Sequence, residues 1–575
     1  MPLRKPLSFK TTISRSSILR YNKRSMKRVW ELITKKQTSV GSAAIILVSM
    51  VFASRVLGLI RDRLLSARFA PDELGVYFAA FRLPNLIFEL LVMGALTSAF
   101  IPVFTKYLTR GEEKEGWHMA SILINLSVIL LAAISLPIII WAPQFSRLLA
   151  PGFSDSQIAQ MAAFSRFMII FQVVPLLVGN FFTGILQSYS MFLMPALAPV
   201  VYNVGIILGI VTLSGSMGLY APVVGVGVGA FLFVLIQLPI LLKVGYAHEL
   251  SFDAHHKGVQ EVGRLIGPRM LGLAVSQIDS TVDLILSSLL GARMVTIFNF
   301  AQNLQGLPVG LFGASVAQAA LPTLSMASVR EDKEQFKESI VKAIHQILFF
   351  VLPSSVFFIV LRIPIVRLIF GASRFDWEAT VLTGMTLSMF SISLFAQSIV
   401  HVLARGFYAL YDTKTPVITS VISIAVNTIG SIIFIQVYHL PVWSLGLSTS
   451  IASIINATIL FVLLDKRVGS FPRRKLFVSP TKMIIAAVIA GVAIFIPLKL
   501  FDQLVFDTTR TFGLFLLTGT AGGLGLLMYL AISWVFNVGE VHSFIALMKR
   551  VRRSQPVLLE PAHEVVTGGE QDKLS

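Results

Sequence analysis

The sequence predicts an all-α integral membrane protein of about fourteen transmembrane helices, arranged as two six-helix lobes followed by a C-terminal helix pair. Three observations support this fold class. Of the 575 residues, 55% are hydrophobic and only 13% are charged, whereas soluble domains carry about a quarter charged residues. The apolar residues form continuous runs long enough to cross a bilayer and do not alternate as barrel strands do. Basic residues are concentrated in alternate connecting loops.

Residues 1–40 are strongly basic, and Glu31 is the only acidic residue among them. The segment is too long, and the apolar run after it too extended, for a cleavable signal peptide. We expect a retained cytoplasmic tail that either lies on anionic lipid or is a disordered extension that only sets the orientation. Residues 541–575 are polar and are expected to form a second cytoplasmic tail.

The expected spans are the runs that reach the roughly 20 mostly apolar residues needed to cross the hydrocarbon core. The six spans of the first lobe are Gly41–Leu64, Val76–Phe104, Met119–Trp141, Met161–Leu186, Pro195–Leu213 and Tyr220–Val244. The six spans of the second lobe are Leu265–Leu290, Val295–Leu324, Ile340–Leu361, Ala379–Leu403, Pro416–Val437 and Trp443–Leu464. The final pair is Met483–Leu500 and Phe512–Phe536.

Lys and Arg cluster in the loops that fall on the same side as the basic N-terminal segment, for example near residues 106–114, 330–342 and 466–475. The opposite loops carry few basic residues. By the positive-inside rule, both termini are expected to face the cytoplasm. Most of the formal net charge of +19 then comes from basic residues that set the orientation of the chain in the membrane. This argues against nucleic-acid binding, and membrane lipids are the expected surroundings.

A weak internal repeat suggests how the chain is divided. The segment Gly184–Tyr189 resembles Gly406–Tyr411 in its glycine and tyrosine positions. Repeats of this kind place a substrate cavity between two lobes, near the membrane midplane. The expected division is a tail at 1–40, an N-lobe at 41–245, a C-lobe at 246–465, a helix pair at 466–540 and a tail at 541–575.

Arginines inside the expected spans are candidate functional residues, because charge is costly in a bilayer. Arg55 and Arg61 lie towards the end of the first span, and Arg82 and Glu89 share one face of the second. One interpretation is a basic cavity that binds a phosphate group, whose oxygens suit the guanidinium fork. The alternative is structural: the arginines reach the membrane interface, or pair with Asp62 and Glu89.

Asp279 and Asp283 lie one helical turn apart in the seventh span and therefore share a helix face. Asn427 in the eleventh span and Thr449 in the twelfth offer neutral oxygens of the kind that a sodium site uses. We expect Asp283, Asn427 and Thr449 to couple transport to a cation, Na⁺ or H⁺. The alternatives are an acid that pairs with an arginine and polar residues that only join helices.

Other functional classes are disfavoured. The chain has no Cys, which excludes disulfides, thiol catalysis and Cys-ligated metal sites. The histidines lack metal-ligand spacing, and there is no P-loop sequence. The aqueous loops are short, so we expect a transporter without a resident cofactor and not an enzyme. A non-transporting membrane scaffold is the other class, but it would have no need of intramembrane charges.

Three regions carry motifs of a known family. The first contains Ser54-Arg55-Val56-Leu57-Gly58, Arg61-Asp62 and Phe81-Arg82-Leu83-Pro84-Asn85. The second is Leu307–Gly313 with Leu321-Pro322, and the third and most specific is Ala404–Pro416, read ARGFYALYDTKTP. Over roughly residues 40–540 the chain resembles the MurJ (MviN) family of lipid II flippases and, more loosely, the wider MOP exporter superfamily.

The resemblance implies that the chain flips undecaprenyl-pyrophosphate-linked peptidoglycan precursor, lipid II, across the cytoplasmic membrane by alternating access of two lobes. It implies a basic substrate cavity at Arg55 and Arg61. It also implies a sodium site formed by Asp283 with Asn427 and Thr449, and membrane potential is a further possible driving force.

The sequence departs from the family pattern at several positions. Phe88 and Asn303 stand where the family usually has cavity arginines, and Gly75 stands where an acid is common. Because two arginines are missing, either lipid II is carried in a rearranged cavity or the substrate is another polyprenyl-linked oligosaccharide. A drug or cation exporter of the same superfamily is the more distant alternative.

Overall fold

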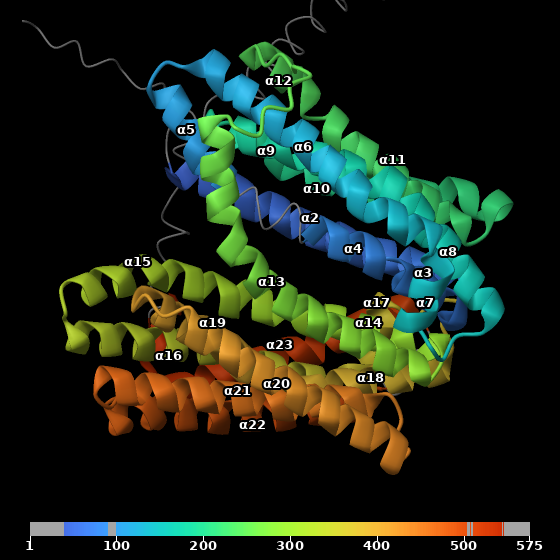
Figure 1. Ribbon diagram of the computed structural model, residues 1–575. Helices are drawn as coiled ribbons and strands as arrows, with labels where there is room; N and C mark the ends of the chain where they lie inside the picture. The colour runs from blue at the N-terminus through green and yellow to red at the C-terminus, as the bar shows by residue number, and fades with distance from the viewer. Residues whose placement is uncertain (1–39, 90–98, 503–506, 508–509, 543, 546–575) are drawn as a thin grey trace, which may run out of the picture.

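The computed structural model describes residues 40–89, 99–502, 507, 510–542 and 544–545; for residues 40–45 and 267–276 it describes the helix but not the side chains. Throughout this part of the chain the long elements are α-helices, with short π-helical segments between some of them (Figure 1). The predicted all-α fold class is confirmed.

The helices fall into two groups. Figure 1 shows α2 to α12 mainly above α13 to α23; α13 descends from the upper to the lower group, and α3 and α7 reach down beside α14 at the right. The first group is α2 Val40–Arg68, α3 Pro71–Ala80, α4 Arg82–Phe88, α5 Ile101–Thr109, α6 Glu113–Ile140, α7 Ala142–Leu149, α8 Asp155–Met168, η3 Ile169–Val173, α9 Val174–Ser188, α10 Leu193–Met217, α11 Tyr220–Leu235 and α12 Leu238–Val244.

The second group contains the helices that follow the loop after α12. They are α13 Lys257–Leu289, α14 Ala292–Pro308, η4 Val309–Ala314, α15 Ser315–Val329, α16 Lys333–Val360, α17 Arg362–Ile369, α18 Trp377–Ser391, α19 Leu394–Ala409, α20 Lys414–Ile432, η5 Ile433–Val437, α21 Trp443–Val468, α22 Arg473–Phe501 and α23 Thr511–Val535.

Ten of the described helices are long and apolar enough to span a membrane, or eleven if the bent pair α18–α19 counts as one span. The other three expected spans, Gly41–Leu64, Val76–Phe104 and Leu265–Leu290, each include residues whose side chains lie outside the described part. The count of fourteen therefore stays a prediction.

Local sequence explains where many of these helices begin and end. Ser154 accepts a hydrogen bond from the Gln157 backbone N–H at 3.3 Å, and Asp332 accepts one from the Gln335 N–H at 2.9 Å, so both cap the helix that follows. Gly245 ends α12 with φ +92°, a conformation that glycine adopts without steric cost. Pro175 lies two residues after the π-helical segment η3, and Pro308 directly precedes η4; each proline lacks the N–H that would continue the α-helical hydrogen bonds.

The two groups touch closely where α3 packs on α14. A Cβ atom on Gly75 would lie 1.8 Å from the Ala292 carbonyl oxygen, so only glycine allows this approach. The Thr296 hydroxyl donates to the Pro71 carbonyl at 2.6 Å, and Arg63 Nη1 donates to the Leu368 carbonyl at 2.6 Å. This structure gives a physical reason for glycine where the family commonly has an acid.

Candidate functional site

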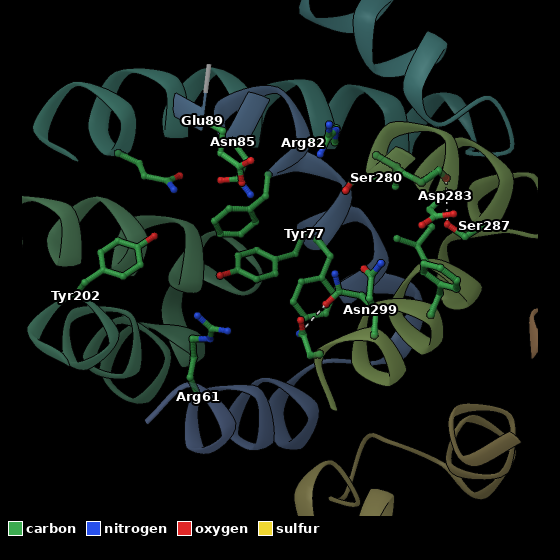
Figure 2. Close-up of a pocket in the computed structure, with 18 residues that line it drawn as sticks. Arg61, Tyr77, Arg82, Asn85, Glu89, Tyr202, Ser280, Asp283, Ser287 and Asn299 are labelled. Atoms are coloured by element: carbon green, nitrogen blue, oxygen red, sulfur yellow. Dashed lines mark hydrogen bonds between the residues drawn. The ribbon is translucent and has the colours of Figure 1, made fainter. Parts of the chain in front are cut away.

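A cavity of about 540 Å³ lies between the two groups of helices (Figure 2). Its walls come from α2, α3, α4, η3 and α10 on one side and from α13 and α14 on the other. Polar atoms make up most of the lining, although the surrounding helices are apolar. The charged side chains that line it are Arg61, Arg82, Glu89 and Asp283.

Arg61 points into the cavity from α2 (Figure 2) and forms an ion pair with the next residue. Its Nη2 lies 2.8 Å from Asp62 Oδ1, and its Nε donates to the same oxygen at 2.9 Å. Its Nη1 donates to Asn203 Oδ1 on α10 at 3.3 Å. Asp62 is only 3% exposed, whereas the Arg61 side chain is 24% exposed. The guanidinium is therefore held in place by a buried carboxylate and still presents one edge to the cavity.

Arg82 lines the cavity and also joins the two groups of helices. Its Nη2 donates to the backbone carbonyl and to Oε1 of Gln277 on α13, at 2.5 and 2.8 Å, and its Nε donates to Thr281 Oγ1 at 2.9 Å. Gln277 Nε2 in turn donates to the Glu89 carboxylate. An anion that took these donors of Arg82 would break the link between α4 and α13.

Arg55 lies apart from this cavity. Its side chain is exposed on α2 and is not among the residues that line the cavity. Arg55 and Arg61 are six residues apart and so lie on different sides of one helix. In this conformation the cavity thus contains two of the three expected arginines.

The three residues expected to couple transport to a cation come together from α13, α20 and α21. Asn427 Nδ2 donates to Asp283 Oδ1 at 3.2 Å, and the Thr449 hydroxyl donates to Asn427 Oδ1 at 3.3 Å. Asp279 joins the cluster, because its Oδ1 lies 3.4 Å from the same Asn427 nitrogen. Ser448 donates to the Asn427 backbone carbonyl at 2.8 Å, which fixes α21 against α20.

This cluster suits a hard monovalent cation only after the side-chain amide of Asn427 turns over. It contains carboxylate, amide and hydroxyl oxygens, but Asn427 directs its Nδ2 and not its Oδ1 towards the acids. A cation bound at Asp283 would turn that amide over, whereas a proton on the carboxylate would not require the turn. Asp283 also lines the cavity, so the same carboxylate belongs to both sites. Within the described residues, His, Cys, Asp and Glu do not gather in threes as a metal site.

The cavity also contains neutral polar side chains that the sequence analysis did not select as site residues. They are Asn85, Gln172, Asn299, Gln302 and Asn303, with the hydroxyls of Tyr77 and Tyr202. Asn303 Nδ2 donates to Asn299 Oδ1 at 3.1 Å, so these two amides form a pair along α14. Asn303 was marked by the family pattern, and Asn85 lies in a family motif. The other residues are signalled in the sequence only as polar residues within apolar spans, which does not show the direction in which a side chain points.

The comparisons with known proteins agree with the motifs. Residues 69–511 match a family model described as "Lipid II flippase MurJ". The chain belongs to the MurJ family. A lipid II flippase MurJ from Burkholderia cenocepacia is 28% identical over 426 residues, which are 72% of this chain and 81% of the relative. A probable lipid II flippase MurJ from Bdellovibrio bacteriovorus is 27% identical over 529 residues, which are 91% and 98% of the two chains.

Solved structures show the same fold. A structure of lipid II flippase MurJ in an inward closed conformation matches with a TM-score of 0.70 and 26% identity, over 86% of this chain and 98% of that chain. A multidrug MATE transporter of the MOP superfamily, in an inward-facing conformation, matches with a TM-score of 0.62 at 14% identity, over 74% and 98%. The second match is a likeness of fold alone. The predicted membership in the MurJ family is confirmed.

The structure shows where two departures from the MurJ pattern, Phe88 and Asn303, lie relative to the cavity. Phe88 packs against the apolar cluster of Leu176, Ala198, Ala230 and Phe233 and is not among the cavity residues. Asn303, in contrast, lines the cavity. The missing arginine at position 303 therefore changes the cavity wall of this MurJ-family protein directly.

Proposed function

We propose that this MurJ-family chain flips lipid II from the inner to the outer leaflet of the cytoplasmic membrane and acts as a transporter, not an enzyme. The observation that carries the proposal is the polar cavity with Arg61 and Arg82 between two groups of apolar helices. Such a cavity can take a pyrophosphate head group while the polyprenyl tail stays in the bilayer. The MurJ names of relatives that match most of the chain support the same substrate.

The proposed transport cycle follows from the predicted topology. With both termini in the cytoplasm, α2 runs outward, so the close packing of α3 on α14 lies on the outer side. The structure then corresponds to a state closed towards the outside. Arg55 lies about 9 Å nearer the cytoplasmic end of α2 than Arg61, at 1.5 Å of rise per residue. We assign Arg55 to the first contact with the head group and Arg61 and Arg82 to the bound position.

Substrate binding can change the conformation because the head group competes for the hydrogen bonds of Arg82. A ligand shifts an equilibrium only by its different affinity for the two states. A pyrophosphate that binds Arg82 competes with Gln277 and Thr281, and so weakens the connection between α4 and α13. The expected consequence is that the two lobes separate on the outer side and release the head group there.

A coupling ion resets the carrier in this proposal. Asp283, Asn427 and Thr449 would take Na⁺ or H⁺, and the membrane potential adds about 2.3 kcal/mol per charge per 100 mV. Because Asp283 also lines the cavity, a cation on its carboxylate changes the charge that the head group meets.

Complementation tests the proposal. Cells depleted of their own lipid II flippase should grow when they express the wild-type chain, and should fail with Arg61→Ala at equal protein level. Arg68→Ala is the matched control, because Arg68 lies on the same helix but is exposed in its last turn and outside the cavity. Failure of the wild-type chain to restore growth and lipid II translocation would reject the function.

One observation favours an alternative substrate in place of lipid II. Asn303 and Gln302 give α14 a neutral cavity wall where the family usually has charge. A flippase for another polyprenyl-linked oligosaccharide would fit such a wall. This alternative predicts no rescue of flippase-depleted cells, together with binding of a different lipid-linked glycan.

A further inference from the structure

Gln172 is a residue of the cavity lining that the proposed transport cycle does not use. It lies on the π-helical segment η3, lines the cavity and is only 4% exposed. Its Oε1 is buried, and among the described residues nothing donates a hydrogen bond to it. A buried acceptor without a donor destabilises the protein that contains it. Short π-helical segments are often found at functional sites.

Two further polar side chains lie on the same wall. Asn85 comes from α4, which packs beside η3, and Tyr202 comes from α10. Figure 2 shows the Tyr202 hydroxyl directed into the cavity that Arg61 also enters. Neither side chain has a hydrogen-bond partner in the described part of the chain. The wall formed by Gln172, Asn85 and Tyr202, here called the amide wall, is therefore polar, uncharged and unpaired.

The hydrogen-bonding chemistry of the amide wall limits what it can bind. Phosphate oxygens only accept hydrogen bonds, so a pyrophosphate cannot satisfy Gln172 Oε1. That oxygen needs an N–H or O–H donor. The N-acetyl group of an amino sugar offers an N–H and a C=O together, which complement the acceptor and donors of a glutamine amide.

We propose that the amide wall binds an N-acetylated sugar of the head group while Arg61 binds the pyrophosphate, so that Gln172 determines specificity for the glycan. The proposal rests on the lipid II flippase function proposed above. It divides the head group between a charged and a neutral subsite of one cavity. The sugar supplies the donor that Gln172 lacks in the empty cavity.

The test compares two probes on the purified full-length protein: lipid II and undecaprenyl pyrophosphate, which lacks the sugars. Gln172→Met should bind lipid II about tenfold more weakly, the effect of one lost hydrogen bond, and should bind undecaprenyl pyrophosphate as the wild type does. Tyr202→Phe, which removes only a hydroxyl, should weaken lipid II binding several-fold with the same selectivity. Arg61→Ala should weaken binding of both probes.

A stability measurement separates this role from a structural one. Gln172→Met removes an unpaired buried amide, so the Tm of the empty protein should stay unchanged or rise. Gln305→Met is the matched control: Gln305 Oε1 is also buried and without a donor among the described residues, but Gln305 does not line the cavity. This control should leave the affinity for lipid II unchanged.

The outcomes are distinguishable. If Gln172→Met keeps wild-type affinity for lipid II, loses affinity for both probes equally, or lowers the Tm, the sugar subsite is rejected. If the wild-type chain binds undecaprenyl pyrophosphate but not lipid II, the proposed substrate itself is rejected.

Discussion

A substitution at Gly75 directly tests the packing of α3 on α14, where the two groups of helices (the two lobes) touch. In Gly75→Ala the new Cβ would lie 1.8 Å from the Ala292 carbonyl oxygen, and real Cβ atoms essentially never come within 3.0 Å of another heavy atom. Helices α3 and α14 would have to separate by the difference, about 1.2 Å. The neighbouring hydrogen bond from Thr296 to Pro71, now 2.6 Å long, would then exceed hydrogen-bond length.

The free-energy cost of Gly75→Ala in the closed state has two parts, the lost hydrogen bond and the overpacking. Loss of the buried hydrogen bond costs about 1 kcal/mol, and overpacking costs about 1–3 kcal/mol. Both terms act only where α3 and α14 touch, so about 2–4 kcal/mol favours states in which the lobes are apart on this side. That energy corresponds to a shift of roughly 30- to 1000-fold in the conformational equilibrium.

Cysteine labelling measures this shift, because the chain contains no Cys of its own. Ser280→Cys places a thiol at an exposed position of the cavity lining. A membrane-impermeant maleimide added outside the cell should label it at least tenfold faster when Gly75→Ala is also present. Gly58→Ala is the control, since a Cβ there would meet nothing within 4 Å. Equal labelling rates for Gly75→Ala and Gly58→Ala would refute the argument.

Three further predictions follow from single contacts. Arg82→Lys keeps the charge but loses the fork that reaches Gln277 and Thr281, so lipid II transport should fall about tenfold or more in a flipping assay, while protein level is unchanged. Asp283→Asn should make the transport rate independent of the Na⁺ and proton gradients; a rate that still follows either gradient would argue against coupling at this residue. Asp412, in the loop before α20, is partly desolvated, but hydrogen bonds from Thr415 and the charge of Arg467 hold its pKa below the usual range. A depressed carboxyl pKa stabilises the fold above about pH 4 and ceases to do so as the pH falls through the lower, folded pKa. The Tm difference between wild type and Asp412→Asn should therefore be constant near neutral pH and vanish in acid, and a difference that persists at acid pH would contradict the assignment.

Much of the fold class and the family could be predicted from the sequence, because the signals are local. The lengths of apolar runs, the positions of Lys and Arg and the motif Ala404–Pro416 are each contained in one continuous stretch. The grouping of Asp283, Asn427 and Thr449 was also expected, from their polar character within apolar spans and from the family resemblance, and not from their spacing. The structure then brought these three residues within hydrogen-bond distance, from three different helices.

The amino-acid sequence is enough to identify which segments are helical and apolar and which polar residues they contain. Which of those polar residues share a cavity depends on the way the helices pack. Arg55 and Arg61 occupy one helix, yet only Arg61 lines the cavity, while Gln172 lines it and Phe88 does not. The physical reason is that helix formation depends on neighbouring residues, whereas the direction in which a side chain points depends on how each helix is rotated and packed against the others.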